Sequence, residues 1–255
     1  MILAIDVGNT NIIVGLFKGM KLTKKISIPT AEMAHAKSVR LIRKAYFGRT
    51  VNKVLICSVV PGVNSKLSAI LKSIFKVQPL LIGKDVMVPI KNLYKLPHQV
   101  GQDRLINAYA GKLLYGSPIV IIDFGTAVTF DIVNKNGSYL GGLISPGIDL
   151  SLNALSEKTA LLPKVRLKKI TPLVGKTTSA SIASGMIYGY ASMCDGILSK
   201  LKNKLKLNFK SIATGGNAGL ISRASEAVKN IDGDLTLKGI VLAYLASEYR
   251  KNPSK

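Results

Sequence analysis

The sequence predicts an α/β protein built from two similar units, each of which starts with a pair of strands. Two short patterns carry this prediction: Asp6-Val7-Gly8-Asn9-Thr10 near the start of the chain and Asp123-Phe124-Gly125-Thr126-Ala127 near its middle. One apolar run enters each pattern and another leaves it, as in a β-hairpin. Helical periodicity and further short strands follow both hairpins, and this alternation is typical of α/β folds.

The first half of the chain is expected to contain five strands and two helices. Met33, Val39 and Ile42 have helical spacing, and Pro61-Gly62 is typical of the start of a second helix. Residues 85–100 have little periodicity and are expected to form an irregular connector. The expected strands cover residues 1–5, 12–17, 21–28, 51–58 and 79–82, and the expected helices cover residues 31–46 and 61–75.

The second half repeats this order of elements. A helix at residues 102–115 is expected to precede it, because Leu105, Ile106, Leu113 and Leu114 recur at helical spacing. We therefore expect one domain at residues 1–115 and another at 116–255. The elements expected in the second domain are strands at 119–124, 128–133, 138–144 and 211–214, and helices from 145 to about 160, at 177–205 and at 235–249.

Composition sets the class of protein. A chain of 255 residues that is 47% hydrophobic can bury a substantial core in one large or two moderate domains. Its 36 basic and 13 acidic residues give a net charge of +23, which favours nucleotides, acidic metabolites, nucleic acid or membrane phosphates as partners without choosing among them. Cys57 and Cys194 stand alone, and no apolar run reaches about 18 residues, so we expect a cytoplasmic protein.

The two hairpins have the residue types of a phosphate site. Their glycines let the backbone approach a ligand closely, and the hydroxyls of Thr10 and Thr126 can donate to phosphate oxygens. A carboxylate beside such a turn repels phosphate unless a cation stands between them, so Asp6 and Asp123 are interpreted as partners of cations, directly or through water. Either hairpin alone is also compatible with a plain turn. The repetition favours the phosphate interpretation.

Three other motifs leave more than one interpretation open. Asp103, in Gly101-Gln102-Asp103-Arg104, can stabilise a helix N-terminus or accept a proton, and from the residues alone the helix role is favoured. Arg104 can hold a carboxylate in two hydrogen bonds or form a solvated ion pair. Gly175-Lys176-Thr177-Thr178 is not a P-loop, because Ile170 stands where that motif needs glycine, and Thr177 or Thr178 is otherwise a plausible N-cap of the long helix that follows. The loop at 213–219 can contact adenosine or be a simple turn.

Taken together and in this order, the motifs resemble the type III pantothenate kinases. The resemblance covers nearly the whole chain. It implies two ribonuclease-H-like domains of the acetate kinase, sugar kinase, Hsc70 and actin superfamily, facing each other across a cleft. The motifs that carry it are Asp6-Val7-Gly8-Asn9-Thr10-Asn11, Gly101-Gln102-Asp103-Arg104, Asp123-Phe124-Gly125-Thr126-Ala127, Gly141-Gly142-Leu143-Ile144-Ser145-Pro146-Gly147 and Gly175-Lys176-Thr177-Thr178.

The resemblance implies an enzyme that phosphorylates pantothenate with ATP, giving 4′-phosphopantothenate in the first step of coenzyme A synthesis. It assigns Asp103 as the general base, and Asp123 as a partner of a monovalent cation, K⁺ or NH₄⁺. Mg²⁺ is expected near Asp6. The implied ATP-binding residues are Asp6, Val7, Gly8, Asn9, Thr10, Asn11, Ile12, Ile13 and Thr126, and the implied pantothenate-binding residues are Tyr94, Gly101, Gln102, Asp103, Arg104 and Thr178.

The same resemblance implies a homodimer, because Thr178 would contact pantothenate bound to the partner subunit. The chain departs from the family pattern at Gln102, where members commonly carry a small residue. Two alternatives remain at this point. One is another small-molecule kinase of the same superfamily, and the other is a nucleic-acid-binding regulator that keeps a kinase-like fold, which the absence of a helix-turn-helix or an aromatic-rich RNA-binding surface disfavours.

Overall fold

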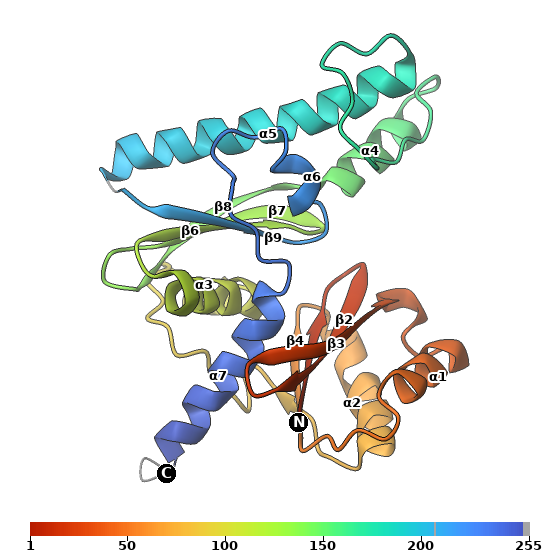
Figure 1. Cartoon of the computed structure of the whole chain (residues 1–255), viewed down its shortest axis with the longest axis vertical. Coiled ribbons are helices and arrows are strands. Elements are labelled where there is room, and N and C mark those ends of the chain that lie inside the picture. The colour runs from red at the N-terminus through yellow and green to blue at the C-terminus, as the bar shows by residue number, and fades with distance from the viewer. Residues whose placement is uncertain (207, 252–255) are drawn as a thin grey trace. The chain divides into compact units, whose positions relative to one another are not determined.

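A computed structural model describes residues 1–206 and 208–251, which form two compact units (Figure 1). Unit 1 comprises Met1–Lys91, Lys95–Ala110 and the segment that begins at Leu235, whereas unit 2 comprises Asn92–Tyr94 and Gly111–Asp234. The units therefore differ from the contiguous ranges 1–115 and 116–255 expected from the sequence. The last helix accounts for most of the difference, because its apolar side chains are buried in the core of unit 1.

The sheet of unit 1 has the strand order β3-β2-β1-β4-β5. A nearly continuous apolar run forms a central strand, β1 (Ile2–Val7), which runs antiparallel to β2 (Asn11–Lys18) and parallel to β4 (Lys53–Ser58). The edge strands are β3 (Lys21–Pro29) and the short β5 (Leu80–Leu81). The register places Asp6 between Ile13 on β2 and Cys57 on β4, at the end of β1 where the first motif begins.

Helices cover both faces of this sheet. On one face, α1 (Ala36–Ala45) and α2 (Pro61–Phe75) pack on Leu3, Ile5 and Val7 of β1. On the other face, the first part of α3 (Gln102–Tyr115) and α7 (Leu235–Lys251) pack on Ala4 and Cys57. The close approach of α7 requires a glycine at position 15, because a Cβ there would lie 2.8 Å from Leu237 Cδ1.

The helix expected at 31–46 begins later than the periodicity indicated. Residues Thr30–Glu32 form a 3₁₀ turn, η1, and α1 starts only at Ala36. His35 has an extended backbone, φ −67° and ψ 142°, which ends any continuous helix before that point. Met33 is nevertheless buried, so its apolar character reports core contact rather than helical structure. A second 3₁₀ turn, η2 (Pro97–Gln99), lies in the irregular connector.

The sheet of unit 2 has the order β8-β7-β6-β9 and repeats the topology of the first. The central strand β6 (Ile119–Phe124) is antiparallel to β7 (Ala127–Val133) and parallel to β9 (Lys210–Thr214), and β8 (Tyr139–Pro146) lies beyond β7. A single bridge between Ala213 and Ile231 stands where unit 1 has β5. Asp123 pairs with Thr129 and Thr214, as Asp6 pairs with Ile13 and Cys57.

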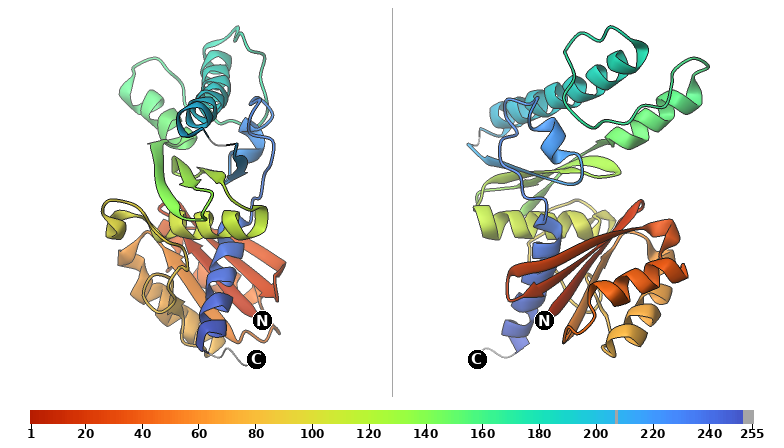
Figure 2. Two further views of the ribbon diagram at one scale, coloured as in Figure 1. Left: turned by 90° about the vertical axis from the view of Figure 1, so that its left-hand side faces the viewer. Right: turned by 45° about the vertical axis from the view of Figure 1, so that its right-hand side comes forward.

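One face of this second sheet is covered by α4 (Ile148–Lys158), α5 (Thr178–Leu205) and α6 (Ala218–Ile221), as Figure 2 shows. Their apolar side chains join Val120, Ile122 and Phe130 in a separate core. The two-sheet α/β architecture confirms the fold class predicted from the sequence. Within the described residues, no helix combines the length and apolar character that crossing a membrane requires.

Candidate active site

The first motif forms a tight turn that two hydrogen bonds from Thr30 hold in place. After β1, the Gly8 amide donates to Asn11 O at 3.0 Å and closes the hairpin. Thr30, just beyond β3, donates its hydroxyl to Gly8 O at 2.7 Å and its amide to Thr10 O at 2.9 Å. The turn itself stays open to solvent, because Asn9, Thr10 and Asn11 are exposed. A braced turn with exposed polar groups suits a phosphate ligand.

Burial and the charges of two carboxylates raise the pKa of one thiol in unit 1. Cys57 is directly paired with Asp6 in the parallel β1–β4 ladder and is fully buried. Burial raises the pKa of the Cys57 thiol well above its usual value, and the negative charges of Asp6 and Asp103 raise it further. The expected cation partner Asp6 and the expected base Asp103 therefore lie near the same point of the sheet. Sequence reasoning missed Cys57, since only the strand register reveals it.

Asp103 occupies the first turn of α3 in a setting that raises its pKa. Its Oδ1 accepts a hydrogen bond from the amide of Arg104 at 2.8 Å. A Cβ on Gly101 would overlap that same oxygen, so only a glycine at position 101 leaves room for the carboxylate in this position. Burial raises the pKa of the Asp103 carboxyl, although the hydrogen bond and the charge of Arg104 oppose this effect. Asp103 thus has the position at a helix N-terminus that the residues alone favoured, and burial also makes its carboxylate a stronger base.

The other two side chains of this motif have different surroundings. Arg104 is buried, with 8% of its surface exposed. Gln102 packs over Gly83, where an added Cβ would lie 2.5 Å from Gln102 Cδ. Gly83 has φ +84°, so the turn after β5 needs glycine on conformational grounds as well. The residue that departs from the family pattern therefore joins the start of α3 to the turn after β5.

In unit 2, Asp123 lies against a glycine-rich loop. A Cβ on Gly215, which has φ +89°, would lie 2.6 Å from Asp123 Oδ1. A Cβ on Gly125 would lie 3.6 Å from the same oxygen. The loop at 213–219, for which adenosine contact was one of two interpretations, thus begins beside the second motif. At Gly215, only a glycine leaves the carboxylate of Asp123 its present position.

The turn at Thr126 is braced by the start of α4. The amide of Gly147 donates to Thr126 O at 2.9 Å, and α4 begins at the next residue. Asn217 Nδ2 donates to Asp149 Oδ2, in the first turn of α4, at 3.5 Å. The second hairpin, the glycine-rich loop and the N-terminus of α4 therefore form one cluster. Helix N-termini favour anions, which agrees with a phosphate ligand near Thr126.

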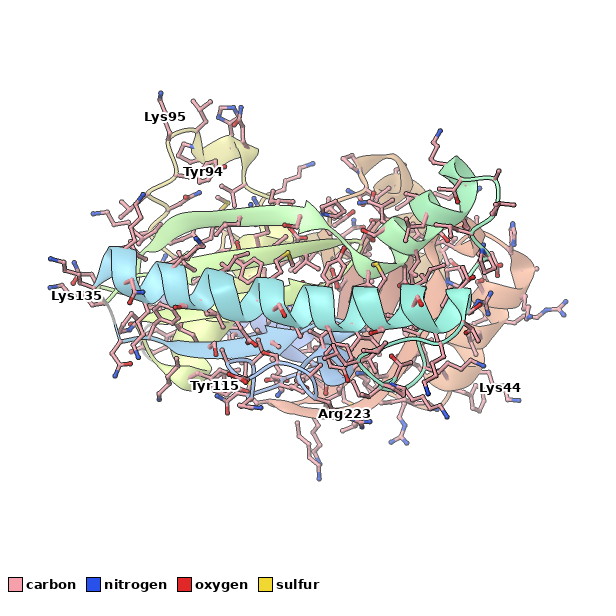
Figure 3. The ribbon with its side chains drawn as sticks, turned by 90° about the horizontal axis from the view of Figure 1, so that it is seen from above. Lys44, Tyr94, Lys95, Tyr115, Lys135 and Arg223 are labelled. Carbon is pink, nitrogen blue, oxygen red and sulfur yellow. The ribbon has the colours of Figure 1, made fainter. Side chains whose placement is uncertain are left out.

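Tyr94 and Thr178, the remaining expected pantothenate contacts, belong to unit 2, whereas Gly101–Arg104 belong to unit 1. The Tyr94 ring lies 6.4 Å from that of Tyr139, centroid to centroid, and the side chain projects at the edge of the molecule in the view of Figure 3. Thr178 is the exposed first residue of α5. The helix cap is its neighbour Thr177, whose hydroxyl accepts from the Ala180 amide at 3.2 Å.

The described residues do not build a metal cage from protein alone. Residues 1–206 and 208–251 contain no group of three or more His, Cys, Asp or Glu side chains able to hold a metal ion. Asp6 and Asp123 instead offer single carboxylates beside phosphate-type turns. This donor set fits Mg²⁺, which commonly takes one or two carboxylates and completes its shell with water and substrate phosphates.

Comparison with known proteins identifies relatives over the whole chain. Residues 2–200 match the family model for type III pantothenate kinase. The type III pantothenate kinase of Sulfurihydrogenibium sp. (strain YO3AOP1) is 42% identical over 249 residues, which cover 94% of this chain and 98% of the relative.

Two solved structures show the same fold at low sequence identity. A conserved protein of the Baf family from Campylobacter jejuni has a TM-score of 0.59, 19% identity and coverage of 99% of this chain and 100% of that one. The activator of the 2-hydroxyisocaproyl-CoA dehydratase from Clostridium difficile, solved with bound ADPNP, has a TM-score of 0.53, 12% identity and coverage of 99% and 97%.

Proposed function

The chain belongs to the type III pantothenate kinase family, which phosphorylates pantothenate with ATP in coenzyme A biosynthesis, and we propose that Asp103 is the general base of this reaction. The observation that carries this proposal is the carboxylate of Asp103, whose pKa is raised by burial and whose charge adds to burial and to the charge of Asp6 in raising the pKa of the Cys57 thiol. Burial strengthens Asp103 as a base, and its Oδ1 is oriented by the Arg104 amide. A second carboxylate, Asp6, is paired with Cys57 in the β1–β4 ladder and is proposed to serve the phosphate side.

In the proposed step, Asp103 takes the proton of the primary hydroxyl of pantothenate as that oxygen bonds to the γ-phosphorus of ATP. The bond between the γ-phosphorus and the bridging oxygen breaks, ADP leaves with that oxygen, and 4′-phosphopantothenate forms. Phosphoryl transfer asks little covalent chemistry of a protein. The contribution of the chain is therefore to hold the base and the two substrates in place.

We assign the ATP phosphates to Asp6–Ile13 and to Thr126. The support is the brace of Thr30 on the first turn and of Gly147 on the second, which fixes both turns before the nucleotide arrives. Mg²⁺, held by Asp6 directly or through water, would neutralise phosphate charge. Asp123 is proposed to hold a monovalent cation, K⁺ or NH₄⁺. Its place beside backbone of Gly125 and Gly215 supports this role, because carbonyl oxygens are ligands of hard cations.

For pantothenate, we propose contacts with Gly101–Arg104, Tyr94 and Thr178. The planar guanidinium of Arg104 suits the carboxylate of pantothenate. Thr178 is exposed at the start of α5, which supports a contact made across a homodimer. Light scattering of the purified protein tests the dimer. We also propose a cytoplasmic location, supported by two free, buried cysteines in the described chain.

Replacement of the proposed base tests the assignment directly. Asp103→Asn keeps the shape of the side chain but removes proton acceptance, so kcat should fall about 10²-fold or more while the KM for ATP changes little. A coupled ADP-release assay with pantothenate measures both values. Asp85→Asn is the matched control, since that carboxylate accepts a hydrogen bond from the amide of Leu81 in β5. Undiminished pantothenate-dependent ADP release from Asp103→Asn would refute the role of Asp103.

A further inference from the structure

The side of unit 1 that carries α1 and α2 has a charge pattern that the kinase reaction does not use. No Asp or Glu occurs between Glu32 and Asp85, a stretch that contains α1, β4 and α2. Most of the basic side chains are exposed, and Lys44 projects outward in Figure 3. The basic residues of this stretch are Lys37, Arg40, Arg43, Lys44, Arg49, Lys53, Lys66, Lys72, Lys76 and Lys84.

A hollow of about 560 Å³ opens in this face, between the C-terminal ends of α1 and α2. Its volume falls within the range of small-molecule sites. Two guanidinium groups, those of Arg43 and Arg49, line it together with Phe75 and Ser73. Phe47, also in the lining, is 88% exposed. The hollow therefore combines cations with an accessible aromatic ring.

The hollow lies away from the catalytic carboxylates within unit 1. Thr50, in its lining, accepts a hydrogen bond from the amine of Met1 at 3.0 Å, so the hollow adjoins the start of β1. Asp6 lies at the other end of that strand. Five residues of β-strand span about 17 Å. A ligand in the hollow would thus be separate from the substrates.

Basic residues in the last turn of a helix are common for a simpler reason, because they stabilise the helix dipole. That reason accounts for Arg43 in α1 and Lys72 in α2. It accounts neither for the absence of any carboxylate over the whole stretch nor for the exposed ring of Phe47. A second copy of the chain is a poor occupant, since it would bring equal positive charge against this face.

We propose that this face, which we call the α1–α2 basic face, binds a nucleotide unit. The base stacks on Phe47, and the phosphates contact Arg43 and Arg49. Stacking on an aromatic ring beside a positively charged groove is the general mode by which proteins bind single-stranded nucleic acid. A flat membrane surface does not enter a hollow, and an acidic peptide supplies no planar base for the ring. The nucleotide unit can come from a strand or from a free nucleotide.

Fluorescence anisotropy with a labelled 12-nucleotide oligo(U) tests the proposal on the full chain. Binding should weaken with added KCl, and each phosphate contact of a single strand contributes about 0.7 to the slope of log K against log [KCl]. Arg43→Gln combined with Arg49→Gln should therefore lower the slope by about 1.4. Phe47→Ala should weaken binding about 5-fold or more, the lower end of base stacking. The melting temperature and kinase activity of each variant should stay unchanged.

Three comparisons make the result decisive. Lys200→Gln combined with Lys204→Gln, on α5 of unit 2, removes the same charge and should leave the affinity and the slope unaltered. Competition by uridine monophosphate would identify a free nucleotide as the source, and binding of oligo(U) without that competition would identify a strand. Equal binding of poly-glutamate or anionic vesicles, or full affinity of Phe47→Ala, would overturn the proposal.

Discussion

Gly101→Ala should remove most of the activity through one added methyl group. A Cβ at position 101 would overlap Asp103 Oδ1 and would lie 3.6 Å from Asp103 Cγ and 3.8 Å from Val59 Cγ1. The carboxylate is the part that can move, because the overlap is with a side-chain oxygen. It must rotate away and give up its 2.8 Å hydrogen bond from the Arg104 amide.

The size of the effect follows from that displacement. A catalytic group displaced by about 1 Å can lose about 10²-fold in rate, so kcat should fall by roughly that factor. The free energy of unfolding should fall by only about 1 kcal/mol, the usual worth of one hydrogen bond. The KM for ATP should stay the same, because residues 6–13 are untouched. ADP release at saturating pantothenate and urea unfolding measure the two quantities.

A double-mutant cycle separates this mechanism from a general loss of substrate binding. In the background Asp103→Ala, the further change Gly101→Ala should have almost no effect on kcat, since the displaced carboxylate is already absent. Gly62→Ala is the matched control, because a Cβ at Gly62 meets no atom within 4 Å. A Gly101→Ala enzyme with kcat within twofold of the parent would refute the reasoning.

Three further outcomes are expected. Gly215→Ala should displace Asp123 and raise the KCl concentration needed for half-maximal activity, whereas Gly216→Ala, whose Cβ meets nothing within 4 Å, should not; equal KCl curves would count against a cation at Asp123. Iodoacetamide at pH 8 should label Cys57 only after unfolding, because burial and the charges of two carboxylates raise the pKa of its thiol. Mass spectrometry measures the labelling, and rapid labelling of the folded protein would contradict this expectation. Asp103→Asn should raise the melting temperature at pH 7. The pKa of Asp103 is raised in the folded state, so its contribution to stability is full below the unfolded pKa near 4 and is lost as pH rises through the folded pKa. A melting temperature that falls in this variant at pH 7 but not at pH 4 would reverse that sign.

Much of the fold could be predicted because strand and helix patterns are local. The hairpin at Asp6 and its repeat at Asp123 have the expected strands, and α3 has the expected bounds. The start of α1 was predicted too early, because burial of Met33 has the same apolar signature as a helical face. Element type is thus recorded in periodicity, whereas the first turn of a helix depends on backbone angles that periodicity does not report.

Local sequence patterns did not indicate which segments belong to which unit. Helix α7 follows unit 2 in the sequence but shares its core with unit 1, and Asn92–Tyr94 belong to unit 2 although the segments that flank them, which end at Lys91 and begin at Lys95, belong to unit 1. At the site, the roles of the motif residues stay predictions from the sequence, whereas Cys57 and Thr30 were not singled out from it. Each becomes visible only through a long-range contact, the β1–β4 register for Cys57 and the brace on Gly8 for Thr30.

Because α7 belongs to unit 1, the core of this unit can be completed only after unit 2 has been synthesised. Leu237, Ile240 and Val241 complete the core that also contains Ala4 and Phe17, so one face of the N-terminal sheet lacks the part of its cover that α7 supplies until this helix leaves the ribosome. At about 5–20 residues per second, translation of Gly111–Asp234 takes roughly 6 to 25 s. During that interval the nascent chain displays apolar surface on β1, β2 and β4 that α7 later covers.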